Sequence, residues 1–323
     1  MQDQTFITKI LKFNTKPSFG NTVVCNIPRH ADLFINAYLQ ITLEDENCPY
    51  IGELFIDHIS VSIGGSVIYK NDYNFIHIYN MLYNTDEKIK MIRNLMGSQG
   101  SKIRIIPLNS IFKNMEHMLH LISLDYHLVS ISIKFNDCSY TEIEDAVILG
   151  EYKKLNENDK RHYIEPHKHL IEQVQTQRQV IDIDEYDQIQ FVNKLKEKKN
   201  LSFSEDDHIS DSIFNNVDIR DKILSFKKDE LNNIILNIPL NFSLSCKELY
   251  WIVKPIGNNF DYSDVIQNAT LQINGNNIFE KQNREYFTKL QHFKHHTNTA
   301  QNVYVYSFTI NPEDYVSSES LNM

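Results

Sequence analysis

The sequence has few of the features on which common enzyme classes depend. Its four cysteines stand apart among 323 residues, with no C-x-x-C spacing: Cys25, Cys48, Cys138 and Cys246. Isolated thiols in a chain of this size are typical of reduced proteins from a cytosol-like compartment. The sequence also contains neither a glycine-rich phosphate loop nor a G-x-S-x-G motif. These absences argue against an enzyme.

Basic charge and long apolar runs are lacking as well. The formal net charge is −10, and no basic cluster is visible, which disfavours nucleic acid as a partner. No apolar run approaches the length needed to span a bilayer. The first residues, "MQDQTFITKI", show no basic region followed by an apolar one, so we expect no secretory signal and a soluble protein made in the cytosol. We discount the N-x-[ST] sequons at Asn200, Asn241 and Asn268 for the same reason.

What the sequence does contain is a succession of short strand signals. They are rich in β-branched residues and bounded by Gly, Pro, Asn or Asp: "TVVCNIP", "AYLQITLE", "HISVSIGG", "KIRIIPL", "LVSISIKF" and "IEDAVILGEY". One helix is predicted near residues 85–97, with Thr85 as N-cap, Ile89, Ile92, Leu95 and Met96 on its apolar face, and Gly97 at its end. Many short strands with few helices predict an all-β protein built from antiparallel sandwiches.

Two of these segments occur twice. In "HISVSIGGSVIY" and "ATLQINGNNIF", Val61 and Ile63 align without a gap on Leu271 and Ile273. The turn dipeptides Gly64-Gly65 and Asn274-Gly275 also coincide, and both favour a tight hairpin. "NTVVCNIP" at 21–28 and "NNIILNIP" at 232–239 match in the same order. Two matches at nearly the same offset predict a duplicated unit of domain size.

The duplication suggests a division of the chain. We expect a first sandwich in residues 1–152, with the helix near 85–97, a linker in 153–169 and a second sandwich in 170–323. Residues 177–231 mix acids, lysines and single apolar residues without a strand period, and the first copy has no counterpart of them. We interpret them as a charged insertion in a surface loop.

The most metal-like group of residues is "EPHKHLIE", with His167, His169 and Glu172. An H-x-H followed by Glu can hold a metal in a cupin, which is itself a jelly roll. A cupin needs three or four residues between the second His and the Glu, with framing glycines. Here only two residues intervene, and no glycine follows until Gly257. We therefore interpret the segment as a solvated linker.

Other polar groups are weaker candidates. "HFKHH" at 292–296 is interpreted as adjacent solvated histidines on a polar loop. The acid pairs Glu53/Asp57 and Asp206/Asp207 have no accompanying nucleophile or oxyanion-type loop. We therefore expect no catalytic, cofactor-binding or metal-binding residues.

Five blocks of the chain resemble the major capsid proteins of nucleocytoplasmic large DNA viruses, the iridovirus, phycodnavirus and mimivirus kind. Phe19 to Leu43 resembles their first-strand region, with Arg29, Asp32 and Leu33 on the Arg-x-x-Asp-Leu positions. Ile51 to Asn84 resembles the family's Ile-Gly-Gly hairpin with the aromatic helix behind it, and Leu121 to Phe135 resembles its Leu-x-Tyr-His strand, with Tyr126 and His127 on the family positions. Pro166 to Gln175 resembles the family's linker, and Val303 to Met323 resembles its Tyr-Ser-Phe-x-x-x-Pro block.

The resemblance implies a double jelly roll, two antiparallel β-sandwiches side by side. It also implies a homotrimer that forms a pseudo-hexameric capsomer of an icosahedral capsid, in contact with neighbouring capsomers and minor capsid proteins. No nucleic acid is implied as a partner, and the inner virion membrane only indirectly. The protein would belong to the virion and be assembled in the host cytoplasm.

Two departures from the family leave alternatives open. Family members usually begin with an extra segment that links neighbouring capsomers, whereas here "MQDQTF" enters the first strand almost at once. The second copy has no equivalent of "LVSISIKF" or "EIEDAVILGEYK", so we expect a chain truncated at both ends relative to the family, with its second jelly roll incomplete at the C-terminus. The chain would then be a fragment, a split-gene product completed by a separately encoded C-terminal piece, or a shortened accessory paralogue. Two other hypotheses remain: a non-catalytic carbohydrate- or partner-binding sandwich, and a cupin-type metalloenzyme.

Overall fold

The computed structural model describes residues 5–97, 100–108, 118–124, 126–164, 173–179, 226–228, 234–242, 246–255 and 260–312. The chain divides into two compact units. One contains residues 1–174 together with 244–322, and the other contains residues 175–243. In the described residues, no helix is long and apolar enough to cross a membrane.

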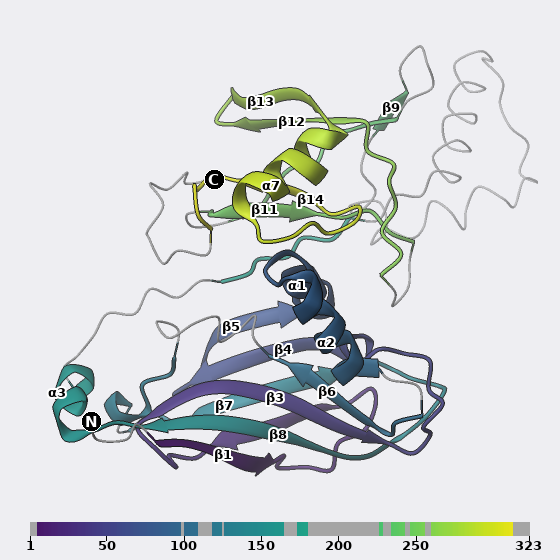
Figure 1. The fold of residues 1–323 in the computed structure, drawn as a ribbon. Coiled ribbons are helices and arrows are strands. Elements are labelled where there is room, and N and C mark those ends of the chain that lie inside the picture. Colours follow the sequence, from purple (N-terminus) through teal and green to yellow (C-terminus); the bar gives the residue numbers. More distant parts are fainter. Residues whose placement is uncertain are drawn as a thin grey trace, which may run out of the picture. The chain divides into compact units, whose positions relative to one another are not determined.

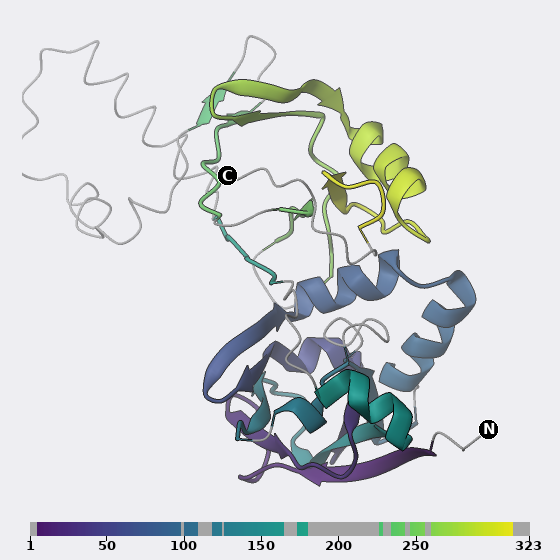
Figure 2. The same cartoon turned by 90° about the vertical axis from the view of Figure 1, so that its left-hand side faces the viewer.

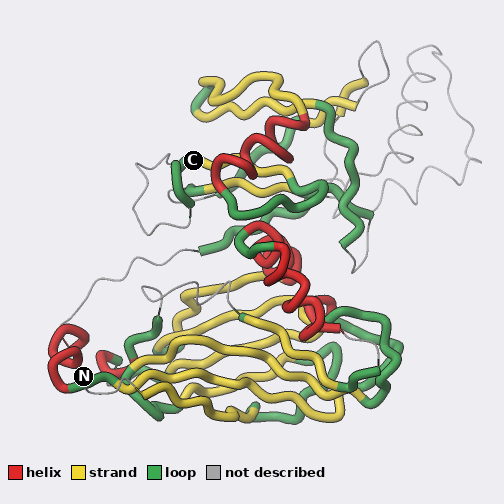
Figure 3. The backbone as a smooth tube through the Cα atoms, in the orientation of Figure 1, coloured by secondary structure: helices red, strands yellow, loops and turns green. Residues whose placement is uncertain are grey.

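Eight strands of the N-terminal half form two four-stranded sheets (Figures 1 and 3). The order in one sheet is β1 (Thr5–Lys12), β8 (Ile143–Lys154), β3 (Leu33–Leu43) and β6 (Ile103–Pro107). The order in the other is β2 (Thr22–Ile27), β7 (Val129–Phe135), β4 (Ile56–Ile63) and β5 (Ser66–Asp72). All neighbours are antiparallel. The late strands β7 and β8 lie inside the sheets beside early ones, which is the strand arrangement of a jelly roll.

Period-two alternation builds the core between these sheets. In β7 the residues Val129, Ile131, Ile133 and Phe135 are buried, whereas the residues between them are half-buried. Side chains from β2, β3, β4 and β8 join the same apolar cluster. The strand signals of the sequence therefore predicted the sandwich correctly, because one face of each strand is apolar.

Helical segments connect these strands: η1 (Gly52–Phe55), α1 (Tyr73–Leu82), α2 (Asp86–Gly97), η3 (Leu121–Ser123) and α3 (Glu157–Ile164). The helix expected near 85–97 is confirmed as α2, and the Lys88 amide lies 3.4 Å from the Thr85 hydroxyl that caps it. Ile89, Ile92 and Met96 are buried as expected. Leu95 is 42% exposed, so its place on the apolar face was wrong. Helix α3 lies in the segment interpreted as a linker.

The described residues of 244–322, which we call the C-terminal half of the larger unit, contain two strand pairs. β11 (Glu248–Trp251) pairs with β14 (Tyr304–Ser307), and β12 (Asn268–Ile273) pairs with β13 (Asn276–Asn283). A helical segment over residues 284–295 follows β13 directly, as Figure 2 shows, and includes the π-helix η4 (Tyr286–Leu290) and α7 (Gln291–His295). In the other unit, β9 (Phe226–Lys228) pairs with β10 (Ile234–Leu236). The insertion expected at 177–231 lies outside the described residues, apart from 177–179 and 226–228.

The two predicted hairpins have the same register around their turns, and the second has one further register shift, between Ala269 and Leu271. Val61 pairs with Tyr69 and Ile63 with Ser66; Leu271 pairs with Phe279 and Ile273 with Asn276. Each hairpin has a register shift at the same place, after Val61 and after Leu271. Gly64, Gly65, Asn274 and Gly275 all have positive φ angles, as such turns require. The expected equivalence of the hairpins is confirmed.

The equivalence extends to a pair of strands that the sequence did not reveal. Tyr38 pairs with Pro107 and Ile41 with Arg104, while Glu248 pairs with Ser307 and Trp251 with Tyr304. Strand β11 therefore corresponds to β3 with an offset of 210, and β14 corresponds to β6 with an offset of 200. The chain between the two paired strands is therefore ten residues shorter in the second copy. Helix α2 has no counterpart among the described residues.

One expected match is not reproduced in the pairing. Within "NNIILNIP", residues 234–236 form β10, which pairs with β9, whereas the counterpart β2 pairs with β7. Among the residues that the structure describes, the second half shows no counterparts of β7 or β8. In the first half these two strands join the other strands into four-stranded sheets. This explains why the second half consists of two-stranded pairs.

Candidate functional site

Helix α1 is the element around which the polar and aromatic contacts of the larger unit gather. It begins at Asp72, whose side chain accepts a hydrogen bond of 2.9 Å from the amide of Phe75. This is a standard N-cap. Toward its own sandwich, the helix buries Ile76 in the core.

A buried carboxylate fixes α1 to that sandwich. Glu53, in η1, is fully buried, and its Oε1 accepts a hydrogen bond of 2.6 Å from Asn80 Nδ2. Its Oε2 lies 2.6 Å from Nδ1 of His77. A buried carboxylate is costly without partners, and here both of its oxygens have one. The role of Glu53 is therefore to position the helix.

The opposite face of α1 packs on the C-terminal half. Ile78 and Leu82 form an apolar cluster with Val303 and Val305, completed by Tyr262 and Ala300. The ring of His77 stacks on that of Phe260, with centroids 3.8 Å apart. The last carbonyl of the helix also has a partner, because the Asn298 amide donates to the Leu82 carbonyl at 3.0 Å.

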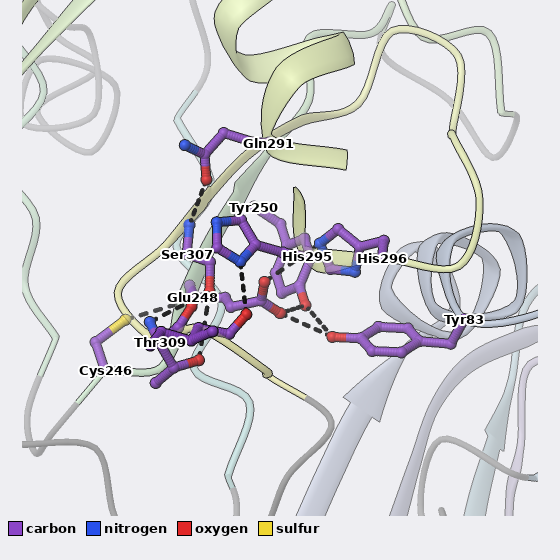
Figure 4. A network of polar contacts seen from close by, with 10 residues as sticks. Tyr83, Cys246, Glu248, Tyr250, Gln291, His295, His296, Ser307 and Thr309 are labelled. Atoms are coloured by element: carbon purple, nitrogen blue, oxygen red, sulfur yellow. Dashed lines mark hydrogen bonds and ion pairs between the residues drawn. The ribbon is translucent and has the colours of Figure 1, made fainter. Parts of the chain in front are cut away.

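A part-buried polar network continues from the end of α1 (Figure 4). The hydroxyl of Tyr83 donates to Oε2 of Glu248 at 2.7 Å and lies 2.8 Å from the hydroxyl of Tyr250, which also donates to Glu248. Burial, followed by the charge of Glu248, raises the pKa of Tyr83 and of Tyr250 well above the usual value. Both tyrosines are therefore neutral hydrogen-bond donors at physiological pH.

Two histidines of the C-terminal half adjoin this network. His296 Nε2 lies 3.2 Å from Glu248 Oε1, and the rings of His296 and His292 have centroids 5.9 Å apart. His292 is fully buried. Burial, followed by the neighbouring His296, lowers the pKa of His292 to about 4. His292 is therefore a neutral core residue near pH 7.

This arrangement connects the end of α1 with β11 and with the end of α7. Oε2 of Glu248 accepts from two tyrosine hydroxyls, and Oε1 faces His296. No group of three or more His, Cys, Asp or Glu in the described residues could hold a metal ion. A surface pocket of about 260 Å³ lies elsewhere, lined by apolar residues with Arg29, Tyr126 and His127. No carboxylate is among the described residues that line it.

The structure separates the acids and histidines weighed in the sequence. Glu53 contacts His77 and Asn80, whereas Asp57 contacts His58 at 2.7 Å, so the two acids share no partner. Interpreting 292–296 as a solvated polar loop was wrong. These residues form α7 and its end, and the side chains of His292 and His296 are buried because they face the core of the second half.

Several candidates cannot be placed. His167, His169 and Glu172 lie outside the described residues, as do Asp206, Asp207 and the sequon at Asn200. Of the other sequons, Asn241 and Asn268 are exposed. Sequence reasoning missed Tyr83, Glu248 and Tyr250. Their only sequence signal was the aromatic richness of the chain, because the network joins residues 165 positions apart.

Comparisons with known proteins agree with this architecture. Residues 4–166 match the family model described as major capsid protein N-terminus, and residues 160–323 match the model described as large eukaryotic DNA virus major capsid protein. The major capsid protein of Pyramimonas orientalis virus is 27% identical over 361 residues, covering 96% of this chain and 78% of the relative.

Solved structures show the same fold at low identity. The PBCV-1 capsid protein VP54, as fitted into a reconstruction of the virophage Sputnik, matches with a TM-score of 0.72 at 18% identity, covering 99% of this chain and 81% of that one. The Faustovirus major capsid protein matches with a TM-score of 0.60 at 9% identity, covering 99% and 85%. The fold is therefore a double jelly roll. Together, the two family matches span the chain, which belongs to the major capsid proteins of large eukaryotic DNA viruses, the structural building blocks of their capsids.

Proposed function

We propose that three copies of this chain associate into a pseudo-hexagonal capsomer and that capsomers tile an icosahedral shell. The observation that carries this proposal is the register-matched repeat. Both the hairpin and the β3–β6 edge recur in β12–β13 and β11–β14. A chain with two similar halves presents two similar sets of edges, so a ring of three chains presents six. A lattice of six-fold outline can then be built from a trimer.

The organisation of the chain follows the same logic. We place the first jelly roll in residues 1–152, the linker in 153–169 and the second jelly roll in 170–323, with a loop insertion at 177–231. Neighbouring capsomers and minor capsid proteins are the partners of the outer surfaces, and assembly takes place in the host cytoplasm. The protein acts through its surfaces without catalytic, cofactor-binding or metal-binding residues.

The test is the mass of the purified protein in solution. Size-exclusion chromatography with light scattering over a hundredfold range of concentration should give about 114 kDa, three times the 38.0 kDa of one chain. Negative-stain images should then show particles of hexagonal outline. A particle of 38 kDa at every concentration would contradict the proposal and favour an accessory or binding role.

A further inference from the structure

The internal repeat relates α1 to the helical segment 284–295. His58 pairs with Asp72 at the end of the first hairpin, and Asn268 pairs with Asn283 at the end of the second. Both closing residues cap the helix that follows. Phe75 N donates to Asp72, and Tyr286 N donates to Asn283 Oδ1 at 3.0 Å. The helices therefore correspond with an offset of 211 residues.

The inward faces of the two helices agree with this alignment. Ile76 is buried in the core of the first half, and its counterpart Phe287 is fully buried against Trp251 and Phe279. Asn80 and its counterpart Gln291 are also both buried. Each makes a polar contact with its own half, Asn80 with Glu53 and Gln291 with the amide of Ser307 at 3.1 Å.

The outward faces differ sharply in exposure. On α1, Leu82 is fully buried and Tyr79 is 8% exposed, and Leu82 packs on the C-terminal half. Their counterparts Phe293 and Leu290 are 83% and 40% exposed. The face that is covered on α1 is thus uncovered on the second helix, although it still carries large apolar side chains. Lys289 stands at the position of Ile78, and its aliphatic stem can pack while its charge reaches solvent.

The surface that receives α1 also has an uncovered counterpart. Leu82 packs against Val303 and Val305, which are 1% and 0% exposed. At the offset of 200 between β14 and β6, these residues correspond to Ile103 and Ile105. Ile103 is 45% exposed and Ile105 is half-buried. Within one chain, α1 packs on Val303 and Val305. The corresponding helix face, with Leu290 and Phe293, and the corresponding strand face, with Ile103 and Ile105, do not have such a contact among the described residues.

We propose that this helix face of one chain packs on this strand face of a second chain. Leu290 and Phe293 of one copy pack on Ile103 and Ile105 of a second copy, in the manner of Leu82 on Val303 and Val305. This contact is head-to-tail, because the two surfaces are different, and such contacts generate a closed ring when the rotation permits. The inference rests on the proposed trimer and names the residues that join its copies.

Charge substitutions test the contact. Phe293→Asp and Ile103→Asp should each convert the 114 kDa species to 38 kDa, because a carboxylate would be buried in an apolar contact. Both side chains are exposed in the single chain, so circular dichroism should remain unchanged. The matched control is Val67→Asp, which alters a residue that is 55% exposed on β5 and outside both surfaces. It should leave the mass unchanged.

Cross-linking gives an independent readout. A Phe293→Cys chain co-expressed with a differently tagged Ile103→Cys chain should give a covalent dimer with a short bismaleimide, above the background of the native cysteines. Either chain alone should not. If the wild type is a trimer, both aspartate variants remain trimeric and the cross-link does not form, the inference is overturned and the proposed function stays intact. A monomeric wild type would overturn both.

Discussion

Acid should destabilise the C-terminal half through His292. The pKa of this buried side chain is about 4 in the folded chain, below the ordinary value of 6.5. The unfolded chain therefore binds more protons between these values. The resulting stability is fully present above pH 6.5 and is lost as the pH falls toward 4. These pKa values correspond to a decrease in the free energy of unfolding of about 2 kcal/mol between pH 7 and pH 5.

The surroundings of His292 offset the effect of burial only in part, since Val303 and Glu248 act to raise the pKa of His292. Burial comes first and the neighbouring His296 second in lowering the pKa of His292, while Glu248 already accepts two tyrosine hydroxyls. Urea unfolding from pH 5 to pH 8 measures the slope. Trp251 serves as the reporter because it is the single tryptophan and lies in the same half, with its ring 5.0 Å from that of Phe287.

The variant His292→Gln removes the titrating group and should flatten this dependence. His295→Gln, on the same helix but with its ring hydrogen bond at an exposed position, is the matched control and should keep the wild-type slope. If wild type and His292→Gln lose stability equally between pH 7 and pH 5, another group titrates and our reasoning about this buried histidine fails.

Three further predictions concern stability and use denaturant titrations. In α2, Ile92→Ala should cost about 2–5 kcal/mol, whereas Leu95→Ala, at a 42% exposed position, should cost about 1 kcal/mol or less; equal costs would contradict the packing. Tyr83→Phe removes a donor from a buried carboxylate and should cost about 1–3 kcal/mol; an unchanged midpoint would mean that water replaces the hydroxyl. Gly150→Ala should cost about 1–3 kcal/mol, because the added methyl would lie 2.8 Å from a ring carbon of Phe34; a neutral effect would show that this core yields.

The sequence predicted the first sandwich and the hairpins because their signals are local. Alternation in "VSISIKF" requires only neighbouring residues, and the Gly64-Gly65 turn requires positive φ angles that few residue pairs supply. The β3–β6 repeat was invisible for the opposite reason. Strand β11 has four residues, all half-buried, and only Leu249 is identical to its counterpart in β3, Leu39.

The polar network around Glu248 could not be predicted because its partners come from distant parts of the chain. "HFKHH" suggested a solvated loop when considered alone. The structure shows a helix whose position is set by the hairpin before it and by the cap at Asn283. Burial of His292 follows from that placement, since a helix with one face on a core buries whatever residue the spacing brings there. The four-residue spacing of His292 and His296 places both on one helix face, but this could be recognised only once the segment was known to be helical.

The two helices of the repeat show how such a chain can diverge and still keep its interfaces. Inward positions retain their roles while changing residue, as Ile76 and Phe287 both fill a core. The outward positions remain large and apolar at Leu82 and Phe293, although only Leu82 is covered within the chain. An 83% exposed phenylalanine adds little to the stability of a single chain, and together with the exposed Leu290 it forms an apolar surface of the kind that favours association. Its presence at the position of a buried interface residue is therefore most simply explained by a neighbouring copy that covers it.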